Sequence, residues 1–265
     1  MKLPEYEWVQ FAKAPLKLVV GQVRFTTLLR FEQKSFIAGF QEAVRDDYPK
    51  VARESTITLQ VSPAGIDRNA SEALWRLSSR DNLWSVVIGE SSLTLESRQY
   101  SSMQDFLDRF SRILEAAKAS LEISDRLRLG LRYVNEFRHP DARDIVHWRG
   151  LLNPEFVGFE ASNLLDGHVI HVFHDIQIQR PDGVLAIRHG LLDGYIVAPL
   201  FQQRPDTARF YLLDLDYYDT TEGELDIPII LEQMRGYNDI IYRFFRWTLG
   251  SEAYNYLEPL NAQRS

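Results

Sequence analysis

The chain of 265 residues contains no cysteine, and this absence removes several kinds of chemistry at once. Disulfide bonds, thiolate metal ligands and cysteine nucleophiles are excluded, and the absence fits a reducing compartment. The sequence also lacks an apolar run of the roughly 18 residues that cross a bilayer, and its first residues lack an apolar stretch of signal-peptide length. We therefore expect a cytoplasmic protein that does not enter a membrane.

The usual sequence signals of enzymatic chemistry are missing as well. There is no Gly-rich phosphate loop, no nucleophile elbow around a serine and no His-Glu-x-x-His motif. The sequence therefore assigns no catalytic residue and predicts no cofactor. Whether the protein is an enzyme stays open, and a non-enzymatic role is favoured.

The net charge of −7 is unevenly placed along the chain. Residues 1–122 hold 16 basic and 16 acidic side chains, whereas residues 123–265 hold 14 basic and 21 acidic ones. Nucleic-acid binding draws its affinity from the neutralisation of phosphates, so an acidic chain is poorly suited to it. The acidic second half instead favours solubility or a basic partner.

Hydrophobic periodicity predicts an α+β fold, beginning with an N-terminal half at residues 1–122. The alternating stretch Leu16–Phe25 predicts a strand, and apolar residues at helical spacing between Gln33 and Tyr48 predict a helix. A meander of four strands and a long amphipathic helix follow. They are expected at Ser55–Ser62, Ala73–Ser79, Trp84–Gly89 and Ser92–Tyr100, and from Met103 to Ser120.

Residues 123–265 form a C-terminal half that repeats the order of strand, helix, four strands, helix. Its elements are expected at Arg126–Phe137, Ala142–Leu151, His168–Gln179, Val184–Leu192, Tyr195–Phe201 and Phe210–Tyr218, with a last helix from Pro228. This order resembles the duplicated architecture of the TATA-box-binding protein. The halves, closely packed as one globular unit, are expected to form a largely antiparallel, curved sheet with helices on one face. Such a likeness of fold does not fix function.

Two groups of residues in the second half are candidate metal ligands. In His168–Asp175, β-branched residues favour a strand, which places His171 and Asp175 on one face about 13 Å apart. A metal ion there would need ligands from neighbouring strands. Asp214 and Asp216 also share a strand face, as two-metal sites often require. A purely structural role is the favoured interpretation of both groups.

An arginine-lined strand offers a different kind of site. Arg126, Arg128 and Arg132 alternate with apolar residues, and we hypothesise that Arg128 or Arg132 pairs with Asp214 or Asp216 across the sheet.

Gly130, within the same strand, is typical of a bulge, of a close backbone approach or of a bend where the halves join. Alternatively, Gly130 and the nearby residues Arg128, Arg132, Asn135 and Arg138 form an anion-binding face, although the bend is the favoured interpretation. Nucleic acid would instead bind the face of Arg126, Arg128 and Arg132. Trp75 and Trp84, on either side of a turn at Arg80-Asp81-Asn82, are candidates for stacking on a ligand, although core packing is the commoner use of such residues.

Three segments carry a resemblance to a known family. They are Ala14–Phe25, Arg128–Asn135 and Leu212–Asp216, and the helical stretch Tyr237–Leu249 is also similar. On these segments the chain resembles a sporadically distributed family of uncharacterised bacterial and archaeal proteins of about 250–270 residues. The resemblance implies a prokaryotic, cytoplasmic source and an association with mobile elements or defence systems. It implies no activity.

These observations lead to one favoured hypothesis and two alternatives. The favoured one is a non-enzymatic binding or regulatory protein that acts through a protein partner, such as a toxin, an effector or a defence subunit. The first alternative is a hydrolase or nuclease that holds a divalent metal with His171, Asp175, Asp214 and Asp216. The second is nucleic-acid binding through the arginine-lined strand. The sequence does not indicate an oligomeric state.

Overall fold

A computed structural model shows an α+β protein whose main strands form one open, antiparallel sheet of nine strands. The structure describes residues 3–62, 65–142, 144–162, 164, 167, 169, 171–193 and 209–260, with the backbone alone for residues 55–72 and 193. The strand order is β2-β3-β4-β5-β1-β7-β10-β9-β8, and β6 pairs with β11 in a separate small sheet. The predicted α+β class is confirmed.

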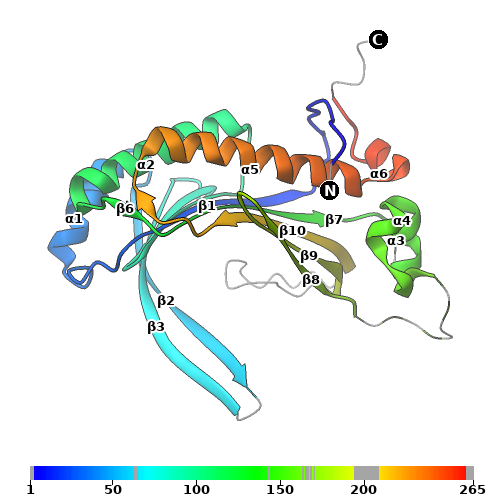
Figure 1. The fold of residues 1–265 in the computed structure, drawn as a ribbon, viewed down its shortest axis with the longest axis horizontal. Helices are drawn as coiled ribbons and strands as arrows, with labels where there is room; N and C mark the ends of the chain where they lie inside the picture. The colour runs from blue at the N-terminus through cyan, green and yellow to red at the C-terminus, as the bar shows by residue number, and fades with distance from the viewer. Residues whose placement is uncertain are drawn as a thin grey trace. The chain divides into compact units, whose positions relative to one another are not determined.

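The bounds of the elements are as follows (Figure 1). The strands are β1 (Leu16–Arg24), β2 (Lys50–Ser62), β3 (Gly65–Ser78), β4 (Trp84–Gly89), β5 (Ser92–Ser97), β6 (Asp125–Arg126), β7 (Arg128–Phe137), β8 (His174–Arg180), β9 (Gly183–Asp193), β10 (Arg209–Asp219) and β11 (Gly223–Glu224). The helices are α1 (Lys34–Val44), α2 (Met103–Leu121), α3 (Ile145–Leu151), α4 (Pro154–Val157), the 3-10 turn η1 (Phe159–Ala161), α5 (Ile227–Thr248) and α6 (Ser251–Tyr256).

Contacts along the chain group it into two compact units, each assembled from separate segments. Unit 1 comprises Met1–Lys17, Arg132–Tyr217 and Gly236–Ser265, and unit 2 comprises Leu18–Leu131 and Tyr218–Arg235. The sequence-based division between residues 122 and 123 stays a prediction.

In unit 2, a meander of four antiparallel strands returns to place β5 beside β1. The strand β3 pairs with β2 along its whole length but with β4 only from Trp75 to Ser78. The rest of the β2–β3 hairpin therefore continues past β4 as a two-stranded ribbon (Figure 1). The strand β3 begins earlier than the sequence predicts because its first residues, from Gly65, pair with β2 beyond the edge of β4, and β2 also begins earlier, with Lys50 opposite Ser78.

Helices α1 and α2 cover one face of the unit 2 strands (Figure 1). The Ser102 side chain accepts a hydrogen bond from the Asp105 amide at 3.2 Å and so caps the start of α2. The helix then buries an apolar stripe that includes Phe106. A Cβ atom on Gly21 would lie 2.9 Å from the Phe106 ring and 2.8 Å from Met234 Cε, so α2 and the start of α5 pack directly on β1.

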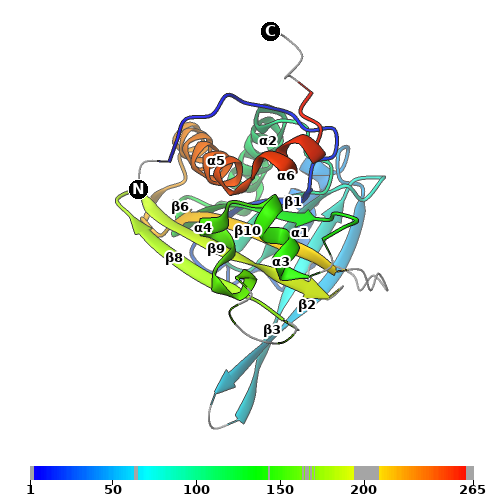
Figure 2. The ribbon, with the colours of Figure 1, turned by 90° about the vertical axis from the view of Figure 1, so that its right-hand side faces the viewer.

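In unit 1, the short helices α3 and α4 pack on strands β9 and β10 (Figure 2). The ring of Trp148 lies 5.3 Å from that of Tyr211, and the ring of Phe156 lies 4.0 Å from that of His189. The later turns of α5 contact the same face, since Tyr217 packs on Tyr237 at 4.6 Å. This face is therefore the helix-covered face of unit 1.

The segment before β1 is held on α5 within unit 1. Trp8 packs on Tyr242, whose hydroxyl also accepts a hydrogen bond from the Val9 amide at 2.8 Å. The Arg246 guanidinium lies over the rings of Tyr254 and Tyr6, at 4.7 and 5.1 Å. Aromatic contacts of this kind attract a cation and bury its stem, so Arg246 ties the chain's first residues to α5 and α6.

Several predicted elements differ from the observed ones. The strand predicted at Arg126–Phe137 is interrupted at Leu127, so Arg126 lies in β6 and only residues from Arg128 onward lie in β7. The strand predicted at His168–Gln179 begins at His174 instead. The strand predicted at Tyr195–Phe201 lies outside the described residues. Among the residues described, no helix is both long and apolar enough to cross a membrane.

Gly190 accounts for the start of β8 at His174, six residues after the predicted start at His168. A Cβ atom at this position would lie 2.0 Å from the carbonyl oxygen of Val172, so the chain before β8 crosses directly over the glycine. We expect Gly190→Ala to lower the free energy of unfolding by roughly 2 kcal/mol, because the overlap forces the crossing segment to move. Urea unfolding followed by tryptophan fluorescence measures this loss.

Gly236→Ala serves as the matched control, because no atom lies within 4 Å of its Cβ position in α5. Alanine in a helix is favoured over glycine by up to about 1 kcal/mol, so this variant should be slightly more stable than the wild type. Equal effects of the two substitutions would contradict the close approach at Gly190.

Candidate functional site

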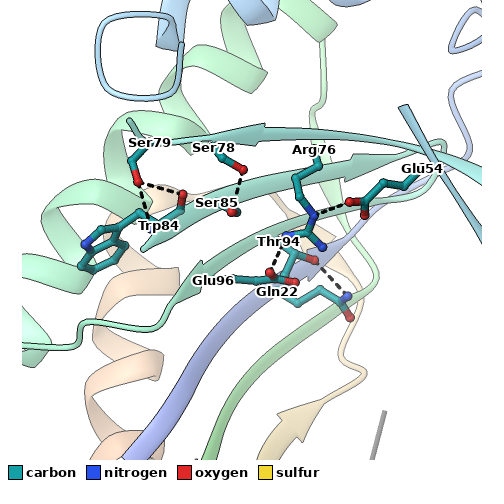
Figure 3. Close-up of polar contacts among 9 residues, drawn as sticks. All are labelled: Gln22, Glu54, Arg76, Ser78, Ser79, Trp84, Ser85, Thr94 and Glu96. Atoms are coloured by element: carbon teal, nitrogen blue, oxygen red, sulfur yellow. Dashed lines mark hydrogen bonds and ion pairs between the residues drawn. The ribbon is translucent and has the colours of Figure 1, made fainter. Parts of the chain in front are cut away.

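Unit 2 carries a polar network on the strand face that α1 and α2 leave uncovered (Figure 3). Alternation along β5 directs Leu93 and Leu95 into the core and Thr94 and Glu96 to this other face. We call the polar residues of this face the open-face network. Its hydrogen bonds form three groups, which join Gln22 with Thr94, Arg76 with Glu54 and Glu96, and Ser78 with Ser85.

Arg76 joins the outer strands of this network (Figure 3). Its Nε donates to Glu54 Oε1 at 2.8 Å and its guanidinium NH1 donates to Glu96 Oε2 at 2.6 Å, which spans from β2 to β5. Burial alone would lower the pKa of Arg76, but attraction to the two carboxylates outweighs it and raises the pKa. Arg76 is therefore a fixed charge whose position is set by two partners.

A second part of the surface continues from Gln22. The Gln22 side chain donates to Thr94 at 3.1 Å and accepts from Arg128 at 3.1 Å, and the Arg128 guanidinium lies 4.4 Å from the Tyr218 ring centroid. A Cβ atom on Gly130 would lie 2.6 Å from an Arg128 guanidinium nitrogen. The group close to Gly130 is thus the Arg128 side chain and not a backbone segment, so the close backbone approach considered for this glycine is not observed among the described residues.

Unit 1 contains a charge cluster around a fully buried carboxylate, Asp214. Arg132 donates to both Asp214 oxygens, at 2.7 and 2.6 Å, in a two-bond pairing. Arg188 lies 3.6 Å from Asp214 and 3.5 Å from Asp175. The hypothesis that an arginine of this strand pairs with Asp214 or Asp216 is therefore confirmed for Arg132 and Asp214. Hydrogen bonding and attraction from Asp214 exceed the opposing effect of burial and raise the pKa of Arg132.

The four candidate metal ligands occupy different settings. Asp175 and Asp214 meet around Arg188, and Asp216 lies two residues beyond Asp214 on the same face of β10. His171 is exposed and precedes β8, so it does not share a strand face with Asp175 as predicted. In the ranges described, no group of three or more His, Asp or Glu residues could hold a metal ion. His168 lies outside those ranges.

The other three predicted binding residues are buried or half-buried in the structure. Asn135 is buried and donates to the Leu213 carbonyl at 3.2 Å, on the opposite face from Arg132 because side chains alternate along β7. Trp84 is buried against Phe106. Trp75 is half-buried under Arg53, at 5.7 Å. A ligand role for Trp75, Trp84 and Asn135 stays a prediction.

Sequence reasoning missed a second cluster of unit 1, in which two histidines stack. The rings of His174 and His189 lie 4.7 Å apart, His174 contacts Glu160 at 2.9 Å, and His189 contacts the Tyr211 hydroxyl at 2.8 Å. Burial, with the nearby charge of His174, lowers the pKa of His189 to about 3, and burial also raises the pKa of Tyr211. Only pairing of β8 with β9, closed by the turn Pro181-Asp182, brings the histidines together.

Comparison with known proteins adds no family to this picture. No family model matches the chain, and no curated protein matches it significantly.

Proposed function

We propose that this is a non-enzymatic binding or regulatory protein whose sheet holds a protein partner. In unit 2, the proposed contact surface consists of the half-buried members of the open-face network, Gln22, Glu54 and Arg76, together with Arg128 and Tyr218. The other members, Ser78, Ser85, Thr94 and Glu96, are buried. The observation that carries the proposal is that these side chains are fixed by one another across the strands, on the face opposite α1 and α2. Figure 3 shows the contacts of Gln22, Glu54 and Arg76. Side chains fixed before binding lose little conformational entropy when a partner docks, and Arg and Tyr are frequent interface anchors.

Charge favours a protein over a nucleic acid as the partner. Phosphate binding needs basic side chains that are available to neutralise it. Arg126 instead lies 3.6 Å from Asp219, Arg128 donates to Gln22, and Arg132 pairs with Asp214. The nucleic-acid alternative is therefore less supported than protein binding.

The hydrolase alternative is also less supported. Carboxylates that bind a catalytic metal ion direct their oxygens to the ion. Both oxygens of Asp214 instead accept hydrogen bonds from Arg132, and Asp175 faces Arg188. A toxin, an effector or a defence subunit remains the kind of partner that the family resemblance suggests.

We also propose that the two halves share a duplicated, TATA-box-binding-protein-like plan. In unit 2, β5 immediately precedes the long helix α2 and lies beside the first strand, β1. In unit 1, β10 likewise precedes the closing helix α5 and lies beside β7. The correspondence is incomplete, because β9 lies directly beside β10, whereas β4 lies between β3 and β5 in the first half. Strand-type backbone chemical shifts for residues 195–201 would supply a fourth strand for the second half, and helical shifts there would contradict the plan.

The partner-binding proposal predicts that Glu54→Lys weakens capture of the partner at least tenfold. Glu54 lies at the rim of the network with its side chain 40% exposed, so lysine there presents the wrong charge to a docked surface. The measurement uses tagged protein immobilised in lysate of the native host, with quantification of each co-purifying protein for the wild type and the variant.

Glu42→Lys is the matched control for this experiment. Glu42 also forms an exposed ion pair, with Arg45 at 3.0 Å, but it lies on α1, across the sheet from the network. The control should capture the partner as the wild type does. Equal capture by the Glu54 variant, or the absence of any co-purifying protein at wild-type strength, would count against the proposed surface.

A further inference from the structure

The strand β8 lies at the end of the sheet order and pairs with β9 on one side. The pairing runs without a shift from His174 opposite His189 to Arg180 opposite Gly183. Its other edge faces no partner among the strands that the structure describes. The backbone N–H and C=O groups along such an edge can pair with a further strand.

Several features that normally protect an edge strand are absent from β8, and its charged residues, Asp175 and Arg180, lie toward its ends. Its sequence, His-Asp-Ile-Gln-Ile-Gln-Arg, has no proline and no lysine, and the strand has no bulge. Ile176 is 43% exposed, and the three central residues carry no charge. The middle of β8 is thus uncharged, partly apolar and regular, as a strand that receives another strand should be.

We propose that a second copy of this chain adds to this edge, β8 against β8 in antiparallel register, with the two-fold axis at Gln177. The sequence of β8 is complementary to itself in this register. Ile176 then faces Ile178 of the partner subunit, and Gln177 faces Gln177 of the partner subunit. Opposite residues of an antiparallel pair share a sheet face, so the isoleucines of both copies meet on one face.

The ends of the strand also tolerate this register. His174 would lie opposite Arg180 of the partner subunit, but each of these residues already has an acidic neighbour in its own chain. His174 contacts Glu160 at 2.9 Å, and Arg180 lies 3.6 Å from Asp182. The antiparallel arrangement also places the two copies of η1, which carries Glu160, at opposite ends of the joined strands.

The absence of native cysteine makes a sharp test possible. Under mild oxidation, Gln177→Cys should form a disulfide-linked dimer, because opposite Cα atoms in antiparallel strands lie about 4.5–5.5 Å apart, within disulfide range. Gln179→Cys is the control, since it lies on the same strand face and is also exposed. Two copies of residue 179 would be about 13 Å apart in the proposed register, so this variant should not cross-link. Equal cross-linking of the two variants would overturn the register.

Light scattering on the unmodified chain completes the test. The wild type should be dimeric at high micromolar concentration, and Ile176→Lys should weaken the dimer at least tenfold, because a charge at the centre of the edge opposes strand addition. Ile229→Lys makes the same change at a 56% exposed site in α5 and should leave the dimer intact. A wild type that stays monomeric, or a dimer that survives Ile176→Lys, would overturn the proposal. Neither result depends on the partner-binding surface of unit 2.

Discussion

Replacement of Arg132 by methionine should lower the free energy of unfolding by about 3–5 kcal/mol. Asp214 is fully buried and accepts both of its short hydrogen bonds from Arg132. Methionine fills much of the same volume but leaves a carboxylate in the interior, where Arg188, 3.6 Å away, is the remaining cation found beside it in the described part of the chain. Loss of one member of a buried ion pair has this order of cost, because the remaining charge is no longer compensated. Chemical unfolding at neutral pH measures the change.

Two further variants separate this effect from a general loss of arginine. Arg243→Met removes an exposed pairing with Asp239 on α5, at 2.9 Å, and should cost at most about 1 kcal/mol. The double variant Arg132→Met with Asp214→Leu replaces the whole pair by apolar groups and should recover most of the lost stability. If the double variant were no more stable than Arg132→Met alone, the buried charge would not be the cause of the loss.

The Arg132 pair also shows how much the sequence could predict. Alternation along two strands placed Arg132 and Asp214 on like faces, and their opposite charges then indicated a cross-strand pair. The same periodic signals located α2 and α5 and most of the sheet, because the spacing of apolar residues within one segment indicates whether that segment is a helix or a strand. The pairing distance and the contribution of Arg188 required the structure, since Arg188 comes from a third strand.

The incorrect predictions share a physical origin in contacts between distant segments. Arg126 follows the alternation of β7 in the sequence, yet it lies in β6, where it pairs with Asp219 and donates to the Thr221 carbonyl. His171 has strand-like neighbours, but the chain just after it crosses over Gly190 and does not enter β8 until His174. In both cases a partner far along the chain decides the backbone path, and periodicity within one segment carries no information about it.

The histidine cluster was invisible to local reasoning for the same reason, although His174 and His189 lie directly opposite each other in β8 and β9. Each histidine alone has an ordinary strand context. Once paired, they form a stack in which His189 is buried against Phe156 and His174 is half-buried. Glu160 contacts His174, and the Tyr211 hydroxyl contacts His189. Burial, together with the neighbouring charge of His174, lowers the pKa of His189 and so makes this residue one source of pH-dependent stability.

We expect stability to fall as the pH is lowered below about 6.5. In the folded protein the pKa of His189 is lowered to about 3, whereas an unfolded histidine has a pKa near 6.5. Between these two values the unfolded chain binds a proton that the folded chain does not, so unfolding is favoured by up to about 1.4 kcal/mol for each pH unit. From pH 8 to pH 5 the expected loss from proton uptake at His189 of the unfolded chain is about 2 kcal/mol.

Urea unfolding at half-unit intervals between pH 8 and pH 5 measures this slope, in a range above the titration of most carboxylates. His189→Phe keeps an aromatic ring in the stack but cannot take up a proton, so its stability should depend less on pH by about 2 kcal/mol over the same range. His171→Gln removes an exposed histidine outside the cluster and should keep the wild-type slope. An unchanged slope in His189→Phe would place the proton uptake elsewhere, because the buried imidazole would then contribute nothing to the difference between the folded and unfolded chains.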